Sequence, residues 1–67
     1  MRTILFSGVQ SGTPIGTASW TDNGLVYQND RVRRGMQAMV NRVGEEKAFE
    51  WFTDWSNGAI RSALISK

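Results

Sequence analysis

The chain has 67 residues, a formal net charge of +2, no cysteine and no histidine. This length predicts one domain over residues 1–67, because a chain of about 60 residues buries only about 60% of its unfolded surface and cannot divide into two cores. The missing residue types exclude disulfides, thiolate or imidazole metal ligands and histidine general-base catalysis, so we expect no metal, no cofactor and no enzymatic activity.

Hydropathy gives no sign of membrane association. The apolar run Ile4–Phe6 is far too short for the core of a signal peptide, and no segment approaches the roughly 20 apolar residues of a membrane span. We therefore expect a cytoplasmic protein. Residues 1–44 carry five arginines and two aspartates, for +3, whereas residues 45–67 carry three basic and four acidic residues, for −1. This asymmetry permits an anionic partner without requiring one.

Three strands are predicted in the N-terminal half. Residues 2–9 and 15–21 are rich in β-forming residues, and residues 25–28 form a shorter third segment. Residues 10–14 have the composition of a turn, and Asp22–Gly24 is the clearest turn in the chain, because Asn and Gly tolerate positive φ. Connections this short cannot cross over a sheet, so we predict a three-stranded antiparallel meander.

Two helices are predicted after the strands. Asn29 and Asp30 are good N-caps for a helix over residues 31–43, and Gly44 is a typical helix end. A second helix begins with Glu45 and Glu46, whose charges complement the helix dipole.

The segment 48–55 of this second helix contains four of the seven aromatic residues of the chain. Ala48, Trp51, Phe52 and Trp55 share one helical face. Phe49 and Trp51 lie at the margins of this apolar face, so we expect one of them to be partly exposed.

Residues 59–67 fit two patterns. Ala59, Ile60, Ala63 and Leu64 match a helical stripe, whereas Ile60, Ser62 and Leu64 alternate as in a fourth strand. The alanine and leucine content favours the helix.

The predicted fold class is therefore α+β, with a three-stranded antiparallel meander, two helices packed on one sheet face and a C-terminal helix or strand. A shift of one residue in register would exchange the two sheet faces. The predicted core consists of Ile4, Phe6, Trp20, Val26, Val32, Met36, Met39, Val40, Phe52 and Trp55.

The uncovered sheet face is the first candidate for function. Leu5, Ile15, Thr17 and Ser19 are expected on this mixed aliphatic and hydroxyl face, and Tyr27 and Trp51 are further candidates for a protein contact, because aromatic residues anchor interfaces. We expect a small non-catalytic domain that binds a protein partner or itself through this face or a sheet edge. The ordinary interpretation of such residues is plain surface.

The alternative is nucleic-acid binding by the first helix. Arg31, Arg34 and Arg42 cluster on one side of it, with Arg33 on a flank, and guanidinium groups bind phosphate oxygens well. The low total charge instead favours an ordinary solvated helix face. A helix-turn-helix is disfavoured, because the second helix would direct Glu46, Glu50 and Asp54 at phosphates.

Overall fold

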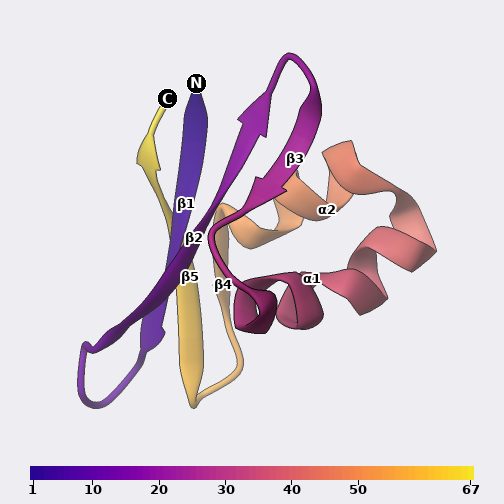
Figure 1. The fold of residues 1–67 in the computed structure, drawn as a ribbon. Helices are drawn as coiled ribbons and strands as arrows, with labels where there is room; N and C mark the ends of the chain where they lie inside the picture. Colours follow the sequence, from indigo (N-terminus) through magenta and orange to yellow (C-terminus); the bar gives the residue numbers. More distant parts are fainter.

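The computed structural model describes all 67 residues as a five-stranded sheet and two helices. In chain order the elements are β1 (Arg2–Gly8), β2 (Pro14–Thr21), β3 (Gly24–Tyr27), α1 (Asp30–Val43), α2 (Glu45–Phe52), β4 (Asp54–Ser56) and β5 (Ile60–Ser66). Both helices lie on the same side of the sheet (Figure 1). The α+β class and the two helices are as predicted from the sequence.

The sheet is antiparallel throughout, with strand order β3-β2-β1-β5-β4. The predicted meander is confirmed as its β3-β2-β1 half. The preference for a C-terminal helix is wrong, because residues 60–66 form β5, in which Ser62 pairs with Phe6 of β1. The meander alone would leave the other edge of β1 without backbone partners. Satisfying those groups outweighs the modest helix propensity of alanine and leucine.

The second helix is shorter than predicted and ends at Phe52. Thr53 closes its last turn, with both its amide and its hydroxyl donating to the carbonyl of Glu50. Trp55 therefore lies in β4, opposite Ser62. Its ring still packs against Phe52, with centroids 5.0 Å apart and planes at 68°. The predicted contact between Phe52 and Trp55 therefore exists, although Trp55 makes it from a strand and not from a helix.

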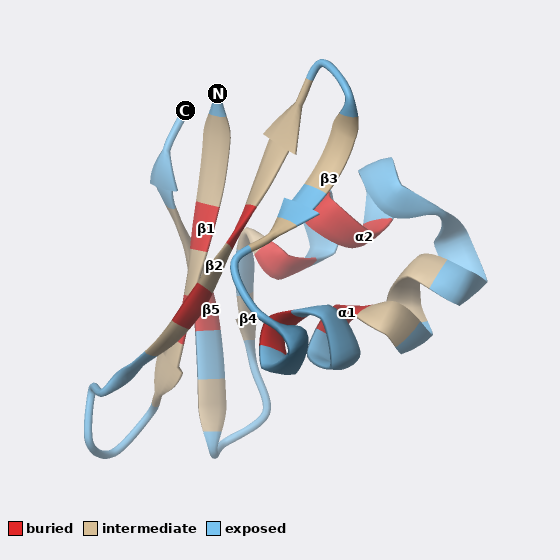
Figure 2. Ribbon diagram, in the orientation of Figure 1, coloured by how far each residue is buried: buried red, intermediate tan, exposed pale blue.

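The hydrophobic core lies between the sheet and the helices (Figure 2). Trp20, Met39, Val40 and Trp55 are partly buried against it. Val26, predicted in the core, is 52% exposed, because it pairs with Ser19 and shares the outer face of the sheet. The buried cluster consists of Ile4, Phe6, Ala18, Val32, Met36, Phe49 and Phe52.

The two marginal aromatic residues of α2 differ as expected. Phe49 is 1% exposed and Trp51 is 54% exposed. Phe49 packs against Trp20 of β2, with ring centroids 6.2 Å apart, and so joins α2 to the sheet.

A β-bulge changes the alternation of β2. Phe6 pairs with Gly16 and Ser7 pairs with Pro14, so Ile15 is an extra residue without a partner. Ile15 packs against the core on the helix side of the sheet. Its predicted place on the uncovered face is therefore wrong, because strict alternation does not hold across a bulge.

The first turn of α1 rests directly on β2 through Asn29. Its Nδ2 donates to the carbonyl oxygen of Ile15 at 3.0 Å, and its Oδ1 accepts from the amide of Val32 at 2.9 Å, as an N-cap does. Gly16 permits this approach, because a Cβ there would lie 2.6 Å from Asn29 Nδ2 and 2.8 Å from Val32 Cγ2. The absence of a side chain at Gly16 thus sets the distance between the sheet and α1.

Replacing Gly16 with alanine should lower the free energy of unfolding by about 1–3 kcal/mol, because the added methyl group must displace Asn29 or Val32. Urea denaturation followed by circular dichroism measures the change. Gly35→Ala is the matched control, since a Cβ at this helical position meets no atom within 4 Å, and it should raise stability by about 0.5–1 kcal/mol. Equal midpoints for the two variants would contradict the close contact at Gly16.

An ion pair joins the start of the sheet to the second helix. The Arg2 guanidinium donates to the Glu50 carboxylate and also lies over the Phe49 ring, 5.3 Å from its centroid. This hydrogen bond holds the pKa of Glu50 below its usual value. Because the folded-state pKa is lowered, the pair stabilises the fold at neutral pH and loses this effect as pH falls through the lowered pKa.

Glu50→Gln should therefore lower Tm at pH 7 but have little effect in acid, where the wild-type carboxyl is also protonated. The difference in Tm should be constant above about pH 5 and shrink as the pH falls below about 4.3, the usual pKa of glutamate. Thermal melts from pH 2 to 8 measure it. Added salt should also reduce the difference at pH 7, because both side chains are exposed. A difference independent of pH would contradict a role for the Glu50 charge.

Candidate functional site

The face of the sheet opposite the helices is uncovered (Figure 1). Ile4, Phe6 and Ala18 point toward the helices and are buried, so the alternate residues of β1 and β2 point outward. Strand register extends this surface across the whole sheet. We define the open face as Thr3, Leu5, Ser7, Thr17, Ser19, Thr21, Val26, Asp54, Ser56, Arg61 and Ala63.

The centre of the open face carries no charge. Its β1 and β2 residues are hydroxyl or aliphatic and half-buried by one another. Thr3 and Ser19 pair across the strands, and their hydroxyl oxygens are hydrogen-bonded at 3.0 Å. Asp54 and Arg61 carry the only two charges and lie on β4 and β5 at one side. The face thus has a neutral centre and a net charge of zero.

The edges of the sheet offer little backbone for pairing. β3 and β4 are the edge strands and have four and three residues. Beyond β3, Gln28 covers the exposed edge of β2 at Thr17. Its side-chain Oε1 accepts from the backbone amide of Thr17 at 2.9 Å, and its backbone amide donates to the carbonyl of Thr17 at 2.9 Å. Asn29 occupies the next carbonyl, that of Ile15. Short and blocked edges disfavour the addition of a strand from another chain. The open face therefore offers a partner more surface than the sheet edges do.

The six residues predicted at a protein interface do not form one surface. Leu5, Thr17 and Ser19 lie together on the open face. Ile15 and Tyr27 lie on the helix side against the core, and burial, helped by the Glu45 carboxylate, raises the pKa of Tyr27.

Trp51 is separate from both groups. It is exposed on α2, which lies in the helix layer. A surface that used Leu5 and Trp51 together would have to include both sides of the molecule.

Five of the eleven residues of the open face are not predicted there from the sequence, namely Val26, Asp54, Ser56, Arg61 and Ala63. Val26 is predicted in the core, although the two-residue Asp22–Asn23 turn, which pairs Thr21 with Gly24, places Val26 opposite Ser19 on the outer face. Arg61 and Ala63 are not predicted on this face because the sequence of residues 59–67 favours a helix over the alternative fourth strand. Asp54 is predicted in the second helix, but α2 ends at Phe52, two residues earlier.

The arginines predicted to bind nucleic acid are all exposed but are not equivalent. Arg33 and Arg34 both contact the Asp30 carboxylate, at 2.8 and 3.4 Å. Arg31 and Arg42 form no ion pair and lie about 16 Å apart along α1, at 1.5 Å per residue. One carboxylate thus neutralises part of the proposed phosphate-binding surface.

The structure contains no group of three or more acidic side chains arranged to hold a metal ion. Neither helix has the length and apolarity needed to cross a bilayer. No family model, no curated protein and no solved structure matches this chain.

Gln28→Ala should expose the amide of Thr17 to solvent and so increase its hydrogen-exchange rate, because that amide loses its acceptor at the edge of β2. NMR of the ¹⁵N-labelled protein measures the rate for each residue. Gln37→Ala is the matched control, since the Gln37 side chain bonds Asn41 within α1. An unchanged rate at Thr17 would show that Gln28 does not close this edge.

Proposed function

We propose that the protein is a small non-catalytic interaction domain that forms a homodimer by packing the open face against the open face of a second copy. The observation that carries this proposal is that both helices cover one face of a five-stranded sheet and leave the other face uncovered, with an uncharged centre. A neutral surface of threonine, serine and aliphatic side chains costs less solvation energy to bury than a charged surface does.

A second copy suits the charges at the side of the face. A two-fold axis repeats every contact twice and places the same surface on both partners. Asp54 and Arg61 have opposite charges, and neither forms an ion pair within the chain. Two copies of the face therefore have no net repulsion, and each Arg61 has a carboxylate available on the other copy.

The size of the face indicates a reversible dimer. Five strands spaced about 4.8 Å apart, with a mean of roughly six residues of 3.3 Å each, give an area of roughly 450 Å² per copy. Burial of about 900 Å² in total lies at the low end of specific interfaces. Only ten residues of the chain are buried, so this additional burial would also contribute to stability.

The alternative function is nucleic-acid binding through Arg31, Arg33, Arg34 and Arg42. The contacts of Arg33 and Arg34 with Asp30 lower the positive charge available to phosphates. Nucleic-acid binding is therefore the less favoured function, and the sedimentation experiment below also tests it.

Sedimentation equilibrium tests the proposal. The wild-type protein should dimerise reversibly at micromolar to millimolar concentration, and 0.5 M salt should weaken the dimer little, because the centre of the face is neutral. Leu5→Lys should weaken dimerisation at least tenfold, because it buries two like charges at the two-fold interface. Val43→Lys is the matched control, since it adds the same charge in the last turn of α1, where Val43 is already 42% exposed.

Thr17→Lys provides a second variant if Leu5→Lys does not fold, because Thr17 pairs with Leu5 and has a polar side chain. A wild-type monomer at all concentrations, or equal association of the Leu5 and Val43 variants, would contradict the proposal. If the protein instead cosediments with a labelled mixed-sequence oligonucleotide, and this binding decreases steeply as salt is added, the result would support nucleic-acid binding through the arginines of α1.

A further inference from the structure

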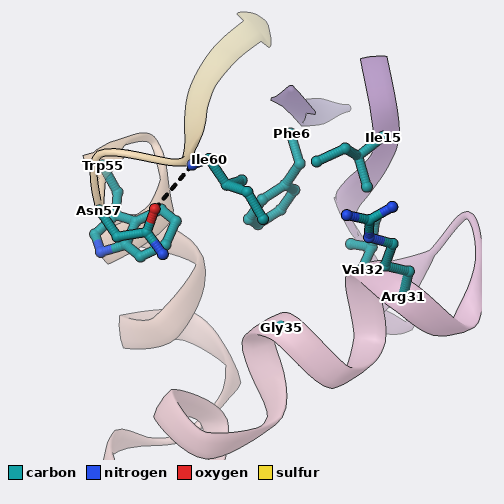
Figure 3. A pocket seen from close by; sticks show the side chains of 8 residues that line it. All are labelled: Phe6, Ile15, Arg31, Val32, Gly35, Trp55, Asn57 and Ile60. Atoms are coloured by element: carbon teal, nitrogen blue, oxygen red, sulfur yellow. Dashed lines mark hydrogen bonds between the residues drawn. The ribbon is translucent and has the colours of Figure 1, made fainter. Parts of the chain in front are cut away.

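A cavity on the helix side of the sheet is lined by residues that the proposed dimer does not use. Its volume is about 310 Å³, at the lower end of the range of small-molecule pockets. Phe6, Ile15, Val32, Trp55 and Ile60 form its apolar wall, between the first half of α1 and the ends of β1, β2 and β5 (Figure 3). Because this cavity and the open face lie on opposite sides of the sheet, each can be tested without the other.

Two polar groups lie on opposite sides of this apolar wall. Arg31 extends beside Ile15 and Val32, whereas Asn57 lies beside Trp55 (Figure 3). Asn57 Oδ1 accepts from the amides of Ala59 and Ile60, at 2.9 and 2.8 Å. These two are the hydrogen bonds of the Asn57 side chain within the protein, and both use Oδ1.

The charge at the cavity belongs to Arg31 alone. Its guanidinium forms no ion pair, and no acidic residue lines the cavity. A second, more polar cavity shares Ile15, Arg31 and Ile60 and is also lined by Ser11 and Thr13. Arg31 therefore lies where the apolar space meets a polar opening.

Gly35 is a further residue of the cavity lining, and it is exposed to solvent. It lines the cavity from the middle of α1, where glycine is less favourable than alanine. A Cβ at Gly35 would meet no atom within 4 Å, so packing within the protein does not require glycine there. A methyl group would instead occupy part of the cavity.

We infer that this cavity binds a small amphipathic monocarboxylate, with its apolar body against Phe6 and Ile60 and its carboxylate on Arg31. A planar guanidinium binds a carboxylate through two parallel hydrogen bonds. One arginine with no second cation nearby matches one negative charge, whereas a phosphate dianion would keep an unbalanced charge. A carboxylate without a hydrophobic portion, such as acetate, would make no use of the apolar wall and should bind more weakly.

Hexanoate is a suitable probe, and hexanamide and hexylamine are its neutral and cationic counterparts of equal chain length. NMR titration of ¹⁵N-labelled protein to about 20 mM should show hexanoate shifting the amides of Val32, Gly35 and Ile60, with hexanamide binding about tenfold more weakly and hexylamine not at all. A lack of hexanoate binding at this concentration, or shifts confined to other surfaces, would overturn the inference.

Two variants test the roles of Arg31 and Gly35. Arg31→Gln should make hexanoate and hexanamide bind equally, whereas the control Arg42→Gln, which removes another unpaired arginine of α1, should leave the tenfold preference. Gly35→Ala should weaken hexanoate about tenfold while stabilising the fold, so this loss cannot arise from unfolding. An unchanged preference in Arg31→Gln, or unchanged affinity in Gly35→Ala, would refute the site.

Discussion

The close contact between β2 and the start of α1 is the constraint on which the two-layer arrangement depends. Asn29 satisfies a backbone carbonyl of the bulged strand and a backbone amide of the helix with one side chain. It can do so because Gly16 has no Cβ in the space between them. Bonds of this kind to otherwise unpaired backbone groups define direction as well as distance, and Val32 and Met36 of the helix belong to the same buried cluster as Ile4 and Phe6.

The contact also explains why the two sides of the sheet differ. Once α1 is seated on β2, α2 follows after one residue and covers the same face, where Phe49 and Phe52 complete the core. The bulge at Ile15 adds an aliphatic side chain to this covered side, and the outer side keeps threonine, serine and leucine. One face is thus closed by the chain itself, and the other is available to a partner.

The arginines of α1 illustrate how packing changes the meaning of a sequence pattern. Four arginines on one helix indicate a phosphate-binding surface when the helix is considered alone. In the fold, Arg33 and Arg34 both form ion pairs with Asp30. Arg31 lies beside an apolar cavity, and Arg42 lies near the other end of the helix. The cavity consists of residues from β1, β2, α1, β4 and β5 together with Asn57, so no local segment of the sequence predicts it.

The sequence by itself determined the local elements: three strands joined by tight turns, an Asn29 cap, two helices meeting at Gly44 and most of the core. These features depend on turn chemistry, capping and periodicity within a few residues. Tertiary structure decided that residues 54–66 form strands, because the backbone groups at the free edge of β1 pair with a strand that is distant in the sequence. It also decided the places of Ile15 and Val26, since a bulge and a pairing register, rather than alternation along one strand, fix which face of a sheet a side chain occupies.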